Sequence, residues 1–284
     1  MKLYEPSTIR TIREEHGFRF TKSLGQNFLI DKNIIDYIVD GAEIEPEDTV
    51  IEIGPGVGAI TYEAAKVAKK VIAIEIDKNL IPILNETLRE FDNVEIINED
   101  VLKLDINKVI ADNGGGQVKI LGNLPYYITT PIIMKLFEEG VKAQSITIMM
   151  QKEVADRINA KPKTKAYGGL SVAVQYYCTV EKLADVPRSS FVPQPNIDSV
   201  VIRLDIRKSR PVEITNEKLF FDCIRAGFGQ RRKTLFNSLQ TLQGASKEII
   251  RDSLGAAGVD PIRRAETLTI EEFAKISDEV DKRL

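Results

Sequence analysis

The chain has few of the residues that build metal centres or disulfide frameworks. Its 284 residues include only two cysteines, Cys178 and Cys223, and one histidine, His16. Because the cysteines lie far apart in the sequence, we expect neither a metal site nor a disulfide-stapled fold. We expect both thiols to be buried as small apolar side chains in a reducing compartment.

Long apolar runs and a strong net charge are also lacking. No stretch approaches the roughly eighteen apolar residues of a membrane-spanning helix, and the first twenty residues alternate between charged and apolar character. The net charge of -3 and the pI near 5.6 give no global sign of a nucleic-acid-binding protein. We expect a cytoplasmic protein without membrane contact, in which any polyanion meets a local basic patch.

Short apolar runs alternate with segments that have helical apolar spacing. At 43% hydrophobic residues, the chain can bury a large core. The expected strands are 49–53, 71–76, 94–97, 118–121, 146–150 and, as a late edge strand, 200–206. The expected helices between them are 59–70, 78–91 and 130–139. This alternation predicts a doubly wound α/β domain of three layers.

The composition changes after residue 206. The segment 207–211 is typical of a linker, and the residues beyond it show helical spacing without strand-like alternation. Helices are expected over 217–228, 231–242, 247–257 and 270–280. Residues 207–284 carry 15 basic and 12 acidic side chains, so this part is the better candidate for a polyanion contact. We therefore expect one large domain over 1–206 and a small helical domain, the candidate for a polyanion contact, over 207–284.

A glycine-rich turn directly follows the first expected strand. Gly54, Gly56 and Gly58 would form a tight turn before a helix, where a ligand can approach the backbone. Glycines at every second position differ from the G-x-G-x-x-G pattern of dinucleotide sites. With Glu52 at the strand end, the pattern favours S-adenosylmethionine.

Acidic residues mark the ends of the next two strands. Glu75, followed by Ile76, can accept both ribose hydroxyls of such a cofactor, and Asp100 can accept its adenine amino group beside a backbone contact from Val101. Ligands of open α/β sheets bind beyond the carboxyl ends of the strands, where these side chains would meet.

The tetrapeptide Asn123, Leu124, Pro125 and Tyr126 follows the fourth expected strand. The nitrogen of a nucleobase amine is a poor nucleophile because its lone pair is delocalised. The Asn123 side-chain carbonyl and a neighbouring backbone carbonyl can accept both N–H groups, and Tyr126 can stack on the planar base. The pattern predicts direct methyl transfer to an amino nitrogen, without a covalent enzyme intermediate. A plain strand-to-turn segment is the alternative interpretation.

Taken together, these segments resemble the bacterial small-subunit ribosomal RNA adenine dimethyltransferases, the KsgA family. The resemblance covers residues 20–239 and rests on the segments 24–29, 52–58, 122–126, 151–154, 165–168, 190–193 and 230–234. It implies a Rossmann-like class I methyltransferase sheet with a small C-terminal all-helical domain. It also implies that S-adenosylmethionine is used to dimethylate two adjacent adenosines near the 3′ end of 16S rRNA, in the small (30S) subunit or its precursor, by a monomer that also acts in subunit biogenesis.

The resemblance assigns further residues. The opening segment 1–32 would close over the cofactor and bind it through Gln26, Asn27 and Leu29. The resemblance also places Gly54, Glu75, Asp100 and Asn123 against the cofactor, and it makes Phe191 the aromatic residue that stacks on the flipped-out adenine opposite Tyr126. Without the resemblance, Phe191 would be interpreted as a hydrophobic anchor in a proline-rich connection.

Two basic groups are candidates for RNA contacts. One is formed by Arg231, Arg232 and Lys233 at the start of an expected helix, and the other by lysines that include Lys165 beside Tyr167. Solvated surface charge is the alternative for both. Three other functions remain open: methylation of large-subunit RNA as in macrolide resistance, methylation of a protein glutamine, and a mainly non-catalytic role in ribosome assembly.

Overall fold

The computed structural model describes residues 2–18, 21 and 24–284. Residues 1, 19, 20, 22 and 23 of the expected opening segment lie outside the described residues. The chain divides into two compact units, the first formed by residues 1–155 and 180–206 and the second by residues 156–179 and 207–284. The expected boundary at residue 206 therefore differs from this division over residues 156–179.

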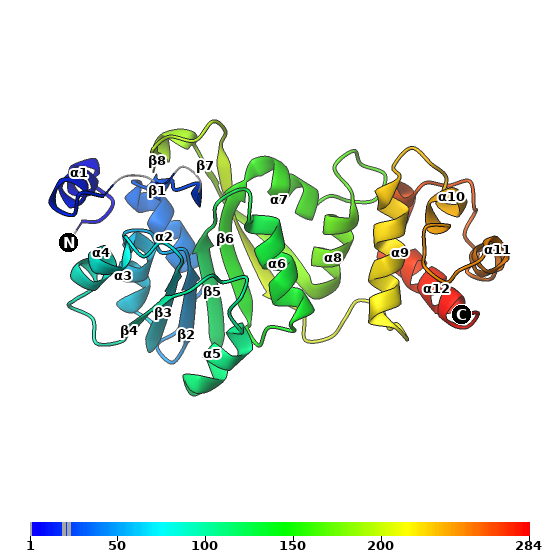
Figure 1. Cartoon of the computed structure of the whole chain (residues 1–284), viewed down its shortest axis with the longest axis horizontal. Coiled ribbons are helices and arrows are strands. Elements are labelled where there is room, and N and C mark those ends of the chain that lie inside the picture. The colour runs from blue at the N-terminus through cyan, green and yellow to red at the C-terminus, as the bar shows by residue number, and fades with distance from the viewer. Residues whose placement is uncertain (1, 19–20, 22–23) are drawn as a thin grey trace. The chain divides into compact units, whose positions relative to one another are not determined.

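A seven-stranded sheet forms the centre of the first unit (Figure 1). Its order is β4-β3-β2-β5-β6-β9-β7, and the bounds are β2 Thr49–Ile53, β3 Lys70–Glu75, β4 Val94–Asn98, β5 Val118–Asn123, β6 Ser145–Gln151, β7 Cys178–Val186 and β9 Ser199–Ile206. Neighbouring strands from β4 to β6 pair in parallel, and β9 pairs antiparallel with β6. The α/β fold class predicted from the sequence is confirmed.

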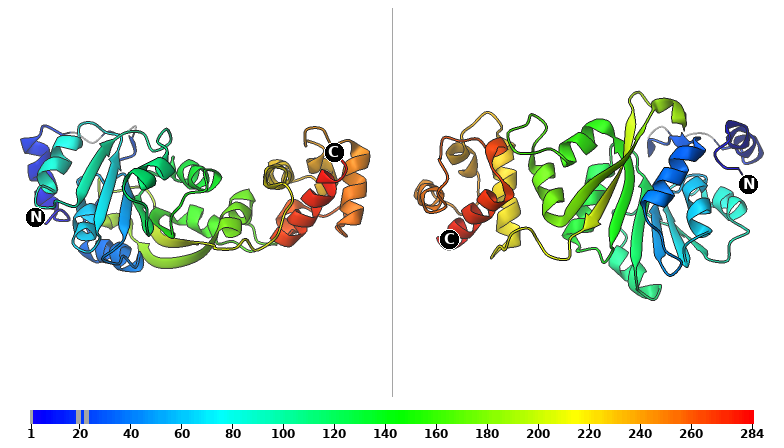
Figure 2. Two further views of the ribbon diagram at one scale, coloured as in Figure 1. Left: turned by 90° about the horizontal axis from the view of Figure 1, so that it is seen from below. Right: turned by 180° about the vertical axis from the view of Figure 1, so that it is seen from behind.

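Helices flank the sheet on both faces. Alternate strand residues such as Val50 and Leu121 belong to a buried cluster with α2, α3 and α4, whereas Ile51 and Ile120, which point the other way, are equally buried. Helix α6 lies in front of the strands in Figure 1. Helix α2, in blue, lies in front of them in the right-hand view of Figure 2, which shows the molecule from behind. The helices of this unit are α1 Pro6–Glu15, α2 Lys32–Gly41, α3 Ala59–Ala65, α4 Ile81–Thr87, α5 Ile106–Asp112, α6 Thr129–Glu138 and the start of α7 Lys152–Ile158.

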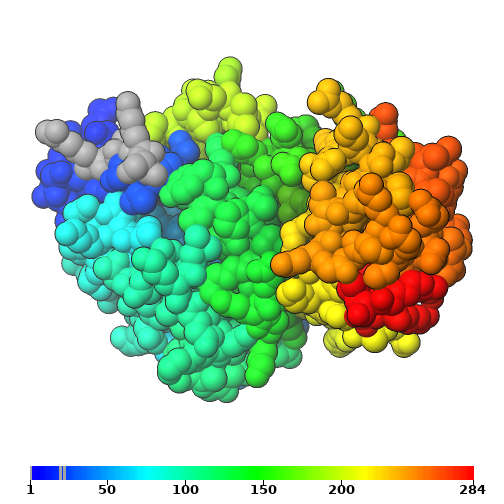
Figure 3. Space-filling view, turned by 45° about the vertical axis from the view of Figure 1, so that its right-hand side comes forward, coloured from blue at the N-terminus to red at the C-terminus, as the bar shows by residue number. Residues whose placement is uncertain are grey.

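The second unit is helical. It contains the end of α7, α8 Gly169–Tyr177, α9 Glu217–Gly229, α10 Leu235–Leu239, α11 Lys247–Ala256, the 3-10 turn η3 Ala265–Thr267 and α12 Ile270–Asp281. The surfaces of α11, in orange, and of the end of α12, in red, adjoin in the space-filling view of Figure 3. Thr269 and Glu272 form a capping box that fixes the start of α12. Residues 156–179 group here because α8 packs on α9, with the rings of Tyr176 and Phe220 5.2 Å apart.

Three sequence expectations about secondary structure are corrected. Strand β9 is not the edge of the sheet, because β7 lies outside it. The helix expected over 231–242 is only α10, because the Thr234 side chain accepts a hydrogen bond from the backbone N–H of Asn237 and so caps a later start. Arg231, Arg232 and Lys233 consequently lie in the turn before α10 rather than on a helix.

A second, two-stranded sheet was not predicted. The strands β1 Phe28–Leu29 and β8 Phe191–Val192 pair antiparallel, with Leu29 opposite Phe191. The backbone N–H of Ile30 extends the pairing by donating to the Ser190 carbonyl at 2.8 Å. This small sheet joins the opening segment to the loop that carries Phe191. Within the described ranges, none of the helices has the length and apolar character that crossing a bilayer requires.

Candidate active site

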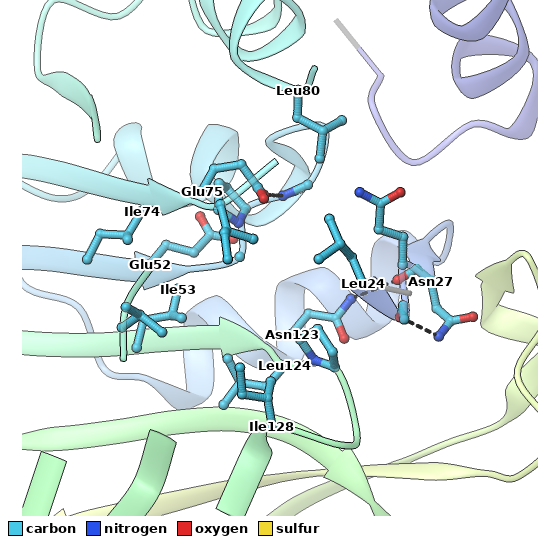
Figure 4. A pocket seen from close by; sticks show the side chains of 18 of the residues that line it. Leu24, Asn27, Glu52, Ile53, Ile74, Glu75, Leu80, Asn123, Leu124 and Ile128 are labelled. Carbon is cyan, nitrogen blue, oxygen red and sulfur yellow. Dashed lines mark hydrogen bonds between the residues drawn. The ribbon is translucent and has the colours of Figure 1, made fainter. Parts of the chain in front are cut away.

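A pocket opens at the carboxyl ends of β2, β3 and β5, within the first unit (Figure 4). It is lined by the opening segment, the glycine turn and the tetrapeptide after β5. The candidate residues that the structure brings together there are Gln26, Asn27, Leu29, Gly54, Gly56, Glu75, Ile76, Asp100, Val101, Asn123, Leu124, Pro125, Tyr126 and Phe191. Gly58 does not line the pocket and instead forms the N-cap of α3.

The glycine turn has a backbone that other residues adopt only with strain. Gly54, Gly56 and Gly58 have φ angles of 71°, 62° and 89°. A Cβ atom at Gly56 would lie 2.9 Å from the Phe28 ring. The turn therefore needs glycine both for its conformation and for the close approach of the opening segment.

Glu75 is held by the backbone around it. Its carboxylate accepts hydrogen bonds from the N–H of Asp77 at 2.8 Å and of Gly56 at 3.3 Å. Burial raises the pKa of Glu75 to about 7, although these two backbone hydrogen bonds act in the opposite direction. The carboxylate is thus fixed in direction before any ligand binds.

Glu52 lies deeper and is only 1% exposed. Its Oε2 accepts a hydrogen bond from the Thr61 hydroxyl at 2.5 Å, while its Oε1 is buried without a partner among the described residues. Burial, with a smaller contribution from the charge of Glu75, raises the pKa of Glu52 to about 7. A buried carboxylate with an unpaired oxygen destabilises a protein unless a ligand compensates it, so this end of the pocket fits a cationic group.

Asp100 caps its own turn and also lines the pocket. Its Oδ1 accepts from the N–H of Leu102 at 3.0 Å, and the neighbouring Val101 is buried. Ile76, beyond the end of β3, is half exposed at the pocket rim. The ends of β3 and β4 together thus offer a hydrogen-bond acceptor, Asp100, beside the apolar side chains of Ile76 and Val101.

The hydrogen bonds around Asn123 define the direction of its amide. The Nδ2 group donates to the Asn27 backbone carbonyl at 3.1 Å. Because a carbonyl can only accept, the amide nitrogen must face Asn27, and Oδ1 must face the other way. The Oδ1 atom has no partner among the described residues, so it is available to a donor in the pocket.

The backbone carbonyls after Asn123 differ in their availability. The Pro125 carbonyl already accepts from the Ile128 N–H and from the Thr129 hydroxyl, each at 3.1 Å. The Leu124 carbonyl has no such partner among the described residues. The second free acceptor beside Asn123 Oδ1 is therefore the carbonyl of Leu124.

The two candidate stacking residues have different surroundings. Tyr126 is half-buried, and its hydroxyl shares a hydrogen bond of 2.8 Å with the Ser199 hydroxyl. Phe191 lines the pocket yet is only 3% exposed, in one cluster with Phe28 and Leu29. A base that stacks on Phe191 therefore has to enter the pocket rather than lie on the surface.

Gln26 connects the opening segment to the end of β3. Its Nε2 donates to Asp77 Oδ2 at 2.7 Å, and its Oε1 accepts from the Thr21 N–H at 2.7 Å. Both polar ends of Gln26 are thus engaged by the protein. Gln26 lines the pocket, but its contacts hold the segment in place.

The candidate RNA contacts lie in the second unit, and one of them is corrected. Tyr167 is only 1% exposed and packs edge-on against the Phe228 ring, so its ring is core and is not available to RNA. The Arg231 guanidinium donates to the carbonyls of Lys165 at 2.9 Å and Tyr167 at 3.3 Å, which braces that loop. The side chains of Lys165, Arg232 and Lys233 are exposed. Cys178 and Cys223 are buried as expected.

Sequence comparison decides the family. The family model described as ribosomal RNA adenine dimethylase matches residues 17–282. The chain belongs to this family. It is 52% identical over 284 residues to ribosomal RNA small subunit methyltransferase A of Clostridioides difficile (strain 630), which covers 100% of this chain and 98% of that protein. It is 55% identical to the protein of the same name from Alkaliphilus metalliredigens (strain QYMF), with 99% of each covered.

Solved structures agree with the ribosomal RNA adenine dimethylase fold. A dimethyladenosine transferase from Plasmodium falciparum superimposes with a TM-score of 0.76 at 27% identity, covering 88% of this chain and 95% of that one. The 23S rRNA methyltransferase ErmE superimposes with a TM-score of 0.67, also at 27% identity, covering 90% and 100%. Both of these solved structures are 27% identical to this chain, whereas the two relatives named ribosomal RNA small subunit methyltransferase A are 52% and 55% identical.

Three residues that contact this candidate site were missed from the sequence. Asp77 follows Glu75 by two positions, and that spacing is the one signal that could have indicated it. Thr61, which bonds Glu52, lies on α3 without any sequence mark. Ser199 contacts Tyr126 only because β9 returns beside β6, which local sequence does not reveal.

Proposed function

We propose that the chain transfers methyl groups to the exocyclic amines of two adjacent adenosines near the 3′ end of small-subunit ribosomal RNA, leaving both dimethylated. The observation that carries this proposal is the pair of free acceptors, Asn123 Oδ1 and the Leu124 carbonyl, that follow β5 at the pocket. Two acceptors match the two N–H groups of an unmodified adenine amine.

The pocket fits S-adenosylmethionine, which supplies an electrophilic methyl group on a positively charged sulfonium. Glu75 would accept the ribose hydroxyls, and Asp100 with Val101 would hold the adenine beside Ile76. The glycine turn leaves room for the rest of the cofactor, within reach of the buried Glu52 carboxylate. Asn27 and Leu29 would cover it from the opening segment.

In this proposal, Asn123 and Leu124 activate the amine. When both N–H groups point at acceptors outside the ring plane, the nitrogen lone pair is drawn out of conjugation and becomes nucleophilic. Tyr126 stacks on one face of the adenine, and Phe191 contacts the other inside the pocket. No thiol takes part, because both cysteines are buried away from the pocket residues.

We assign the RNA phosphates to the exposed basic side chains of the helical unit. Lys165, Arg232 and Lys233 are the proposed contacts, and Arg231 shapes the loop that carries Lys165. We further propose that the protein works as a monomer on ribosomal subunits in the cytoplasm, with a mass near 31.8 kDa by light scattering.

The test is a labelling experiment with tritiated S-adenosylmethionine. Undermethylated small subunits, mature small subunits and large subunits are incubated separately with the protein, and the labelled nucleoside is identified after RNA digestion. We expect dimethyladenosine from undermethylated small subunits alone. Label only in large-subunit RNA would overturn the substrate, and specific binding of small subunits without label would indicate an assembly factor instead.

A further inference from the structure

Ser199 is a buried residue at the edge of the proposed site. It begins β9, no part of it is exposed, and its backbone is paired opposite Gln151 of β6. Among the residues that the structure describes, its side chain forms a single hydrogen bond, to Tyr126, with 2.8 Å between the two hydroxyl oxygens. The sheet therefore fixes the backbone from which the Ser199 hydroxyl reaches Tyr126.

Tyr126, by contrast, lies in a turn. The backbone of this turn is fixed by the two hydrogen bonds that the Pro125 carbonyl accepts. Rotation of the Tyr126 ring about its side-chain torsions is the freedom that remains. A hydrogen bond from the far end of the ring to a rigid strand removes most of that freedom.

The Tyr126 hydroxyl has no evident chemical task. Burial raises the pKa of Tyr126 above its usual value, so the phenol stays protonated at neutral pH and does not act as a base. The nearby Asp198 carboxylate is held by the loop, since its Oδ1 accepts a hydrogen bond from the Arg188 N–H at 3.0 Å. What the hydroxyl does in this structure is to hold the ring.

Ser199 also joins the two proposed stacking residues. The loop 193–198 connects β8, which contains Phe191, directly to Ser199. The hydrogen bond from Ser199 therefore connects the Tyr126 ring to the same segment of chain that carries Phe191.

We propose that Ser199 is a positioning residue that sets the orientation of the Tyr126 ring against the target adenine, and thereby the room for the first methyl group during the second transfer. This inference rests on the proposed function. It predicts an effect on turnover and on product, with little effect on cofactor binding.

The experiment compares Ser199→Ala, Tyr126→Phe and the double variant, using undermethylated small subunits. Thr147→Val is the matched control, because Thr147 is a fully buried residue of neighbouring β6 whose hydroxyl has no partner among the described residues. The experiment measures kcat, the KM for S-adenosylmethionine, and the ratio of monomethyladenosine to dimethyladenosine in the product. Each single variant should lower kcat roughly five- to twentyfold and raise the monomethyl fraction, with KM within about twofold.

The double variant should be no worse than either single variant, because both remove the same hydrogen bond. Thr147→Val should behave as the unaltered protein. Additive losses, or an unchanged product ratio in Tyr126→Phe, would overturn the role of Ser199 while leaving the proposed function in place. Absence of any methyladenosine with the unaltered protein would overturn both.

Discussion

At the scale of single residues, Glu52 combines a cost in stability with a role at the pocket. Its pKa of about 7 in the folded protein lies above the value near 4.5 of an exposed glutamate. The folded state thus binds the proton more tightly than the unfolded state. This residue therefore makes the ligand-free protein less stable as pH rises from about 4.5 to 7, and the loss stays constant above pH 7.

Glu52→Gln should remove this pH-dependent loss. We expect the stability of the variant relative to the unaltered protein to increase between pH 5 and pH 8 by up to about 3 kcal/mol. Denaturant unfolding of the ligand-free proteins at several pH values measures the difference. Glu47→Gln is the control, since the Glu47 side chain is 84% exposed. A stability difference that stays constant across this range would show that Glu52 ionises normally.

Asn123 gives a second prediction at this scale, concerning turnover. Asn123→Ala removes one of the two amine acceptors, so kcat should fall by roughly 10²–10³-fold while the affinity for S-adenosylmethionine changes much less. Single-turnover methylation and calorimetric titration separate the two quantities. Asn107→Ala is a suitable comparison, because Asn107 bonds the backbone of Glu139 and Lys142 rather than any pocket residue. Full turnover with lost cofactor affinity would refute the assignment.

At the scale of elements, the opening segment is the part that completes the site. Its Asn27 carbonyl orients the Asn123 amide, its Phe28 ring lies against Gly56, and Gln26 joins it to Asp77. One short segment thus contacts the proposed amine-binding and cofactor-binding residues together. Displacing it should disturb both.

The hydrogen bond from Gln26 to Asp77 can be removed by one substitution and restored, with the donor on the other residue, by a second. Gln26→Glu places a carboxylate 2.7 Å from Asp77 where an amide donated before, so we expect roughly tenfold weaker binding of S-adenosylmethionine. Adding Asp77→Asn restores a donor and should recover most of the affinity. Equilibrium binding of the unaltered protein and of both variants measures this. If the double variant binds no better than Gln26→Glu, the contact does not hold the segment.

Most strands that the sequence predicted are buried on both faces, and β4 is the exception, since its apolar run was predicted although none of its residues is fully buried. Strand β2 was predicted from its short apolar run, and all of its residues are buried in the structure. Most residues of β7 are partly or fully exposed, and its sequence has no periodic pattern. The two-stranded sheet escaped prediction because each strand has two residues, and Leu29 and Phe191 meet across more than half the chain. The proposed cofactor-binding acids were predicted from their places at strand ends, but the hydrogen bonds to Asp77 and Ser199 depend on tertiary pairing.

At the scale of the whole molecule, charge is divided unevenly. The chain carries a net charge of -3, yet residues 207–284 have more basic than acidic side chains. Counterion release from phosphates depends on local cations rather than on net charge. An acidic protein can therefore bind ribosomal RNA through its helical unit.

Two kinds of basic residue in that unit should be separable by salt titration. Arg232→Ala and Lys233→Ala each remove a proposed phosphate contact, so each should weaken binding and flatten the log Kd against log salt slope by roughly one unit. Arg231→Lys keeps the charge but loses the planar guanidinium, whose Nη2 donates to the carbonyls of both Lys165 and Tyr167. It should weaken binding without changing the slope.

Filter binding of each variant to undermethylated small subunits, from low to high salt, measures both quantities. Lys247→Ala is the matched control, an exposed lysine of α11 in the same unit that should leave affinity and slope unchanged. An unaltered slope for Arg232→Ala and Lys233→Ala would remove them from the RNA surface. A flattened slope for Arg231→Lys would mean that the Arg231 side chain leaves the loop carbonyls and contacts a phosphate itself.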